Sequence, residues 1–101
     1  MKITEVRRYR LYETPSTCRY QLQDALDIDV VWDDGYWLAA PSNPATGSDR
    51  YGTGDSIKKA IRELIEIMDA DYRADLKHVK AKKGNKGSCN YEIYKRMFYK
   101  K

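Results

Sequence analysis

Apolar residues recur at steps of three or four positions between Ile57 and Val79, and this pattern constrains the fold more than any other feature of the chain. It predicts one long amphipathic helix from about Ser56 to Val79, capped by Asp55 or Ser56 and ended by Gly84. A helix of this kind is stable only if another layer of structure covers its apolar stripe. The stripe consists of Ile57, Ala60, Ile61, Leu64, Ile65, Met68, Tyr72, Leu76 and Val79.

A β-hairpin is the second strong local prediction. Asp34 and Gly35 lie between two β-prone runs within residues 27–40, and this pair suits the positive φ angles of a tight hairpin turn. A two-residue loop there places Trp32 directly opposite Trp37. The hairpin also offers apolar side chains that can cover the helix, namely Val30 or Val31, Trp32 or Trp37, and Leu38.

Shorter extended segments flank the hairpin. Residues 3–12 are rich in β-branched and aromatic types but alternate imperfectly, which indicates an edge position or a bulge. Residues 13–25 are predicted to be a loop with one extended stretch near Tyr20–Leu22. Residues 41–49 carry Pro, Ser, Asn and Gly and predict a surface loop, and residues 50–54 predict a short strand before the helix.

Residues 90–99 fit two patterns. Apolar residues alternate from Tyr91 to Tyr99 as they do on a strand, whereas Tyr91, Tyr94 and Phe98 also lie at helical spacing. The Tyr and Ile content favours a strand.

Together these elements predict an α+β fold, in which an antiparallel β-meander carries one long amphipathic helix and a C-terminal strand. The order is β-β-β-α-β in two layers. We expect a single domain over residues 1–101, with a basic helix end and a flexible connector at 77–88. On the polar side of the helix, Asp69 and Arg73 are expected to form an exposed i,i+4 ion pair.

Charge is distributed unevenly along the chain. Residues 1–76 hold 10 Lys and Arg against 14 Asp and Glu, a net −4, whereas residues 77–101 hold 9 against 1, a net +8. Cations interleaved with aromatic rings suit single-stranded nucleic acid, and the same charge suits an acidic protein or simple solvation. The candidate residues for binding nucleic acid or an acidic partner are Arg7, Arg8, Arg10, Lys77, Lys80, Lys82, Lys83, Lys86, Tyr94, Lys95, Arg96 and Lys100.

The residue types needed for catalysis or metal binding are sparse. His78 is the single histidine, and Cys18 and Cys89 lack metal-ligand spacing, so two free thiols and no metal or cofactor are expected. A two-metal site needs several converging carboxylates. Asp27 and Asp29 could share a strand face, but Asp34 is better explained by the turn and Asp55 by the helix cap. The chain has no catalytic signature, and we expect that it is not an enzyme. Apolar runs are too short for a membrane span or a signal-peptide core, which predicts a cytoplasmic location.

Two stretches carry a family resemblance. Residues 30–41 (VVWDDGYWLAAP) and 51–65 (YGTGDSIKKAIRELI) resemble the HicB-like antitoxin domain over residues 28–76. The shared features are a strand, an acidic-Gly-aromatic turn, a second strand, a Pro-containing loop and a helix that starts at Gly-Asp-Ser. The resemblance implies a partial, catalytically degenerate ribonuclease-H-like unit of order β-β-β-α-β. It also implies a protein-binding inhibitor domain, with a homodimer as an open alternative.

These observations favour a small non-enzymatic protein that binds and restrains a protein partner. Binding of nucleic acid through the basic C-terminal segment is the first alternative, motivated by the +8 charge of residues 77–101. A phage or mobile-element inhibitor of a host defence nuclease is the second.

Overall fold

The long helix is present as predicted. The computed structural model describes residues 5–81 and 90–101, and its longest element is α2 (Ile57–Ala81). The Ser56 hydroxyl oxygen accepts the backbone N–H of Lys59 at 3.2 Å, so Ser56 supplies the N-terminal cap. The buried residues of the helix follow the predicted stripe and include Ala60, Leu64, Ile65, Met68 and Tyr72.

The hairpin also forms in the predicted register. Strands β3 (Leu26–Asp33) and β4 (Tyr36–Pro41) are antiparallel, and Trp32 lies opposite Trp37. Their rings meet edge to face with centroids 5.2 Å apart. The turn uses positive φ angles at Asp34 (46°) and Gly35 (113°), because the short connection requires them. The chemistry of one turn is therefore sufficient to set the register of the sheet.

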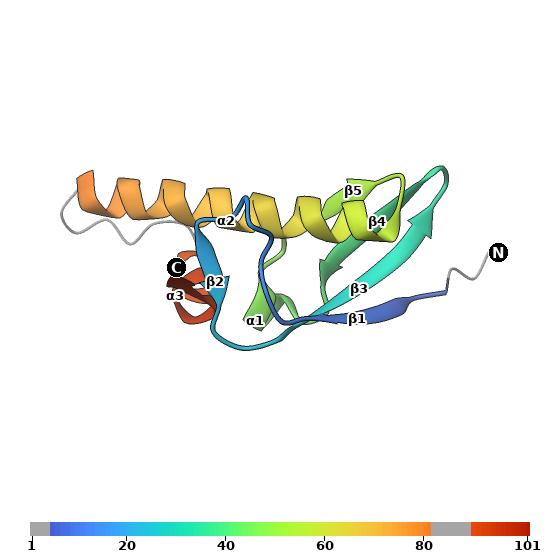
Figure 1. The fold of residues 1–101 in the computed structure, drawn as a ribbon, viewed down its shortest axis with the longest axis horizontal. Coiled ribbons are helices and arrows are strands. Elements are labelled where there is room, and N and C mark those ends of the chain that lie inside the picture. The colour runs from blue at the N-terminus through green and yellow to red at the C-terminus, as the bar shows by residue number, and fades with distance from the viewer. Residues whose placement is uncertain (1–4, 82–89) are drawn as a thin grey trace.

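The hairpin is the centre of a four-stranded antiparallel sheet of order β1-β3-β4-β5 (Figure 1). Strand β1 (Arg7–Leu11) occupies one edge, which confirms the edge alternative for the first segment, and β5 (Gly52–Gly54) occupies the other. The loop predicted at residues 41–49 contains one short helix, α1 (Pro44–Gly47). The first turns of α2 lie over β4 and β5, so the sheet and the helix form two layers.

Alternation along β3 decides which side chains meet α2. Ile28 and Val30 are buried, and so is Ala39, which lies opposite Val30 on β4. Val31 and Leu38 project from the other side of the sheet, because residues directly opposite in an antiparallel pair share one face. Of the two valines left open by the sequence, Val30 therefore packs toward the helix. Leu38 was predicted to cover the helix, but it lies with Val31 on the other side, which we call the outer face.

A second, two-stranded sheet covers the later turns of α2. Strands β2 (Tyr20–Leu22) and β6 (Phe98–Lys100) pair antiparallel, with Leu22 opposite Phe98. The backbone N–H of Gln23 donates to the backbone oxygen of Met97 at 2.8 Å. The side-chain amide of Gln23 donates to the backbone oxygen of Phe98, also at 2.8 Å. The extended stretch expected near Tyr20–Leu22 is thus a true strand, and its partner is the last strand of the fold.

The predicted strand at residues 90–99 is correct only at its end. Residues Tyr91–Met97 form helix α3, and the strand is confined to Phe98–Lys100. Tyr94 and Met97, one turn apart, are buried against the rest of the molecule, whereas Lys95 and Arg96 are exposed. Burial of this one helical face outweighs the β-propensity of Tyr and Ile.

Tyr72 joins the two halves of the core. Its ring centroid lies 4.8 Å from that of Tyr20, 5.8 Å from Phe98, 6.2 Å from Tyr91 and 6.3 Å from Tyr94. One continuous cluster of buried residues therefore runs from the four-stranded sheet, along α2, to β2, β6 and α3.

On the polar side of α2, Asp69 was predicted to be exposed, and this prediction is wrong. Asp69 does form the expected ion pair with Arg73, at 3.2 Å from Nε to Oδ2, but Asp69 is only 1% exposed. Its Oδ1 atom accepts the backbone N–H groups of Arg19 at 3.1 Å and Tyr20 at 3.0 Å. The carboxylate is buried because it satisfies backbone donors at the start of β2, a role that helical periodicity alone does not reveal.

Close contact between β5 and α2 depends on glycine. A Cβ atom on Gly52 would lie 2.3 Å from Leu64 N and 2.5 Å from Ala60 O. Both are backbone atoms of the helix, so neither can rotate away. We expect Gly52→Ala to push β5 off the helix and to cost about 3 kcal/mol or more of unfolding free energy, measured by denaturant titration.

Gly35→Ala is the matched control for this prediction. Nothing lies within 4 Å of a Cβ there, so its cost is limited to the positive φ of 113°. That backbone term is worth about 1–2 kcal/mol. A larger loss for Gly35→Ala than for Gly52→Ala would show that the strand does not need this close approach.

Asp69→Ala should destabilise the protein by about 3 kcal/mol, because it leaves the N–H groups of Arg19 and Tyr20 without their acceptor in a buried site. Asp69→Asn keeps an oxygen acceptor and loses only the charge opposite Arg73, so its loss should be smaller. Thermal or chemical unfolding of both variants tests this order, and equal losses would assign the stabilisation to the ion pair instead.

Candidate binding surfaces

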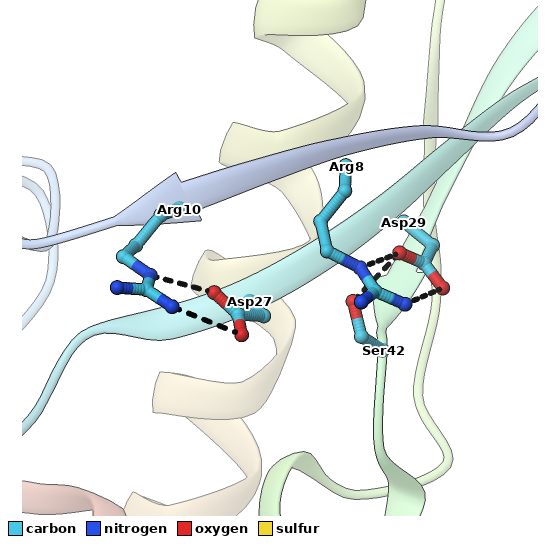
Figure 2. Close-up of polar contacts among 5 residues, drawn as sticks. All are labelled: Arg8, Arg10, Asp27, Asp29 and Ser42. Carbon is cyan, nitrogen blue, oxygen red and sulfur yellow. Dashed lines mark hydrogen bonds and ion pairs between the residues drawn. The ribbon is translucent and has the colours of Figure 1, made fainter.

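Two ion pairs tie the edge strand β1 to β3 on the outer face (Figure 2). Arg8 Nε donates to Asp29 Oδ1 at 2.9 Å, and Arg10 Nε donates to Asp27 Oδ1 at 2.8 Å. In each pair the second guanidinium nitrogen reaches the other carboxylate oxygen at 3.5 Å. The Ser42 hydroxyl donates to Asp29 Oδ1 at 2.7 Å. These residues lie together because the strand register places each Arg opposite its Asp.

The ion pairs change what the two arginines can contribute to binding. The hydrogen bond from Arg8 lowers the pKa of Asp29, with a further contribution from Ser42, and the hydrogen bond from Arg10 lowers the pKa of Asp27. The same contacts raise the pKa of each guanidinium. Both carboxylates are therefore charged at neutral pH and compensate the positive charge of β1. Arg8 and Arg10 add little net charge to a basic surface.

Arg7 lies on the opposite side of the sheet. Its guanidinium carbon is 5.6 Å from the centroid of the Trp37 ring, which is a cation–π contact. Trp37 lies close to the turn of the hairpin. The three arginines of β1 thus divide between two faces, since successive side chains of a strand alternate. The candidate set predicted from the sequence groups them with the C-terminal cations, but β1 and β6 belong to different sheets and the arginines of β1 do not share one face.

Tyr94 is a core residue, which corrects its assignment to a binding surface. Its side chain is fully buried, and its hydroxyl donates to Asp71 Oδ2 at 3.1 Å. Arg50 Nε binds the same Asp71 oxygen at 2.6 Å. Burial is the main cause that raises the pKa of Tyr94 to about 12. The ring of Tyr94 is therefore closed to a nucleic acid base.

The remaining predicted cations occupy three elements. Lys77 is exposed near the end of α2, Lys95 and Arg96 are exposed on α3, and Lys100 is exposed on β6. The side chain of Lys80 and the whole of Lys82, Lys83 and Lys86 lie outside the described residues, as do residues 82–88 of the basic helix end and connector predicted at 77–88. Arg96 shares a pocket of about 500 Å³ with Arg8, Asp24 and Asp27, so the charge there is mixed.

Lys77 lines a separate groove. The other two charged residues that line it, Arg19 and Arg73, are not among the candidate binding residues predicted from the sequence. The groove has a volume of about 740 Å³ and is lined by Arg19, Tyr20, Arg73, Lys77 and Tyr91, with small apolar residues of α2 between them. Arg19 and Arg73 are far apart along the chain, and only the contact of β2 with α2 brings them together. No local pattern signals this.

The outer face also carries an apolar row that was not predicted from the sequence. Val31 and Leu38 lie opposite one another and are only half-buried. Tyr36 is 39% exposed at the hairpin end, where its hydroxyl donates to Asp33 at 2.9 Å, and Val6, just before β1, is 58% exposed. The sequence feature that indicates this row is the pair Val30-Val31. Because successive side chains of a strand point to opposite faces, two adjacent valines place an apolar side chain on each face of β3.

The metal-ligating side chains among the described residues are dispersed, and the described thiol is buried. Across residues 5–81 and 90–101, no three His, Cys, Asp or Glu side chains converge as they do around a metal ion. Cys18 is a buried free thiol, and burial is the main cause that raises its pKa to about 11, so it is protonated at neutral pH. Cys89 lies outside the described part. None of the described helices is long and apolar enough to cross a membrane.

Comparison with known proteins finds no family model, no curated protein and no solved structure that matches this chain. The resemblance to the HicB-like antitoxin domain therefore stays a prediction made from residues 28–76.

The ion pair at Asp29 should make stability depend on acid pH. Because Arg8 and Ser42 hold the pKa of Asp29 below its ordinary 3.8, its contribution is fully present above that value. It is lost as pH falls through the lower pKa of the folded state. We expect Asp29→Asn to lower the melting temperature at pH 7, and the difference from the parent protein to shrink toward pH 2.

Asp24→Asn is the control for that measurement, because Asp24 is exposed and forms no ion pair with the described residues. Its melting temperature should match that of the parent across the same range. A difference for Asp29→Asn that stays constant as the solution is acidified would argue against the ion pair as its source.

Proposed function

We propose that this protein is a non-enzymatic module that binds and restrains a protein partner through the outer face of its four-stranded sheet. The observation that carries the proposal is the apolar row on this face. Helix α2 covers the inner face, and among the described residues α1 and α3 border the outer face at one end, near Asp27 (Figure 1). Val31, Leu38 and Tyr36 thus lie side by side, with Tyr36 exposed and the other two half-buried.

The composition of this face supports a protein as the partner. Protein interfaces combine a central apolar or aromatic patch with a polar rim, and Tyr and Arg are enriched in them. Here the apolar row lies next to the Arg8–Asp29 and Arg10–Asp27 ion pairs, which hold their side chains in fixed positions. A partner that docks on the row meets a polar border that is already ordered, so less conformational entropy is lost on binding.

The edge strand β1 supports the same conclusion. It pairs with β3 on one side only, and its residues Arg7 to Arg10 are exposed. An open edge offers backbone donors and acceptors to an added strand, whether from a partner or from a second copy of this chain. Its charged side chains guard against indiscriminate pairing, so a strand that adds here has to complement them.

The family resemblance of residues 28–76 gives a third support. The HicB-like domain implies a β-β-β-α-β unit that acts by binding a protein, and β1, β3, β4, α2 and β6 occur in that order along the chain, with β6 in the second sheet. Strands β2 and β5 and helices α1 and α3 are additional to this unit. The resemblance supports a partner that is restrained by binding, and not one that is chemically altered.

Leu38→Glu tests the proposal, because it places a charge in the middle of the apolar row without touching the face packed on α2. An affinity-tagged chain expressed in its native cell should recover one protein in stoichiometric amount, and Leu38→Glu should reduce that recovery at least about tenfold. Ser16→Glu, an exposed position away from the sheet, is the matched control and should leave recovery unchanged. Circular dichroism establishes that both variants are folded.

Two outcomes would contradict the proposal. Equal recovery of the same protein by the parent and by Leu38→Glu would move the contact away from this face. A homodimer that light scattering detects, and that Leu38→Glu dissociates, would assign the face to a second copy and remove the need for a partner.

A further inference from the structure

The groove beside the C-terminal half of α2 differs in charge from three other pockets, near Asp27, Glu66 and Asp49, each of which mixes acidic and basic residues. Its three charged lining residues, Arg19, Arg73 and Lys77, are all cations. The 500 Å³ pocket, by contrast, mixes Arg8 and Arg96 with Asp24 and Asp27. A concave surface lined by one sign of charge concentrates the field and attracts ligands of the opposite sign. The groove therefore selects for an anion.

Most of this positive charge is not compensated within the protein. The side chains of Arg19 and Lys77 form no ion pair with the described residues, and residues 82–89 contain no Asp or Glu that could supply one. Arg73 alone is paired, through Nε, with Asp69 Oδ2 at 3.2 Å. The other guanidinium N–H groups of Arg73 remain as donors, and its side chain is 42% exposed.

Asp69 also holds the groove in shape. Its carboxylate is buried below the groove, where it accepts the backbone N–H groups of Arg19 and Tyr20 and binds the side chain of Arg73. One internal anion therefore holds the backbone of Arg19 and the side chain of Arg73, which come from elements far apart in the sequence. A guanidinium that is already in place, as that of Arg73 is, binds a phosphate with less loss of side-chain entropy than a cation on a free side chain.

Two aromatic rings complete the lining. Tyr20 and Tyr91 are half-buried, and each packs against Tyr72, with ring centroids at 4.8 and 6.2 Å. Contact with Tyr72 fixes the rings, and the surface that stays exposed lines the groove. Rings held in this way next to cations are the arrangement on which unpaired bases stack while their phosphates meet Lys and Arg.

We infer that this groove binds single-stranded nucleic acid, with phosphates on Arg19, Arg73 and Lys77 and a base against Tyr91. An acidic peptide could use the cations but would leave the tyrosine rings without a matching partner, so the observations favour nucleic acid. The groove's volume of about 740 Å³ lies within the range of pockets that hold small organic ligands, which suits one or two nucleotides. This activity is separate from protein binding at the outer face.

The test is fluorescence anisotropy with labelled single-stranded RNA and DNA of about 12 nucleotides, measured from about 50 to 200 mM salt. Arg19→Gln combined with Lys77→Gln should weaken binding at least about tenfold. It should also lower the slope of log affinity against log salt by about 0.7 for each phosphate that the two side chains no longer neutralise. Asp69 and Arg73 are left intact, so the variant keeps the interactions that hold β2 on the helix.

Lys58→Gln combined with Lys59→Gln is the matched control. It removes the same charge from two exposed lysines in the first turn of α2, at the other end of the helix from Lys77, and it should change affinity by less than about twofold. Tyr91→Leu keeps an apolar contact with Tyr72 but removes the aromatic face, and it should weaken binding at least about fivefold with little change in the salt slope. Melting temperatures check that each variant is folded.

Three results would overturn the inference. One is an absence of binding by the parent protein at the lowest salt. Another is an equal loss of affinity in the two double variants, which would indicate that only total charge matters. The third is displacement of the oligonucleotide by polyglutamate at lower concentrations than by unlabelled RNA, which would assign the groove to an acidic protein. The Leu38→Glu variant should bind the oligonucleotide normally, so failure here and failure at the outer face are distinguishable.

Discussion

The apolar stripe of α2 has to be covered along its full length, and the four-stranded sheet reaches only its first turns. A helix of 25 residues is about 37 Å long. Gly52 lets β5 approach near Ala60 and Leu64, whereas Tyr72 is covered by residues of β2, β6 and α3. The second sheet and α3 therefore exist because of this requirement. Without them, the later part of the stripe would face water, and Asp69 would lose the backbone donors that justify its burial.

Features set by local chemistry could be predicted from the sequence. The hairpin register follows from Asp34-Gly35, and the extent of α2 follows from its apolar period and its Ser56 cap. The α+β class follows from these two elements. Residues 91–97 could not be assigned in the same way, because Ile93 and Met97 follow the alternation of a strand whereas Tyr94 follows the spacing of a helix, and only the surface that buries Tyr94 decides between them.

The binding surfaces were harder to predict because the number and position of cations in a sequence carry no information about their partners. Arg8 and Arg10 count as basic in the sequence, yet the strand register gives each of them an Asp. Arg19 and Arg73 do not stand out in the sequence, yet a buried carboxylate brings them into one groove. Whether a charge is available for binding depends on long-range contacts, and these appear only when the chain is folded.

The pairing of β2 with β6 has a consequence for the order in which the molecule assembles. The side chain of Gln23 and the carbonyl of Phe98 are 75 residues apart, whereas the hairpin closes over a two-residue turn. Closing a long loop costs entropy before any contact offsets it. We therefore expect β3, β4 and the first turns of α2 to form earlier than the pairing of β2 with β6. The aromatic half of the core is then expected to form last, and the groove between β2 and α2 to be completed only at that step.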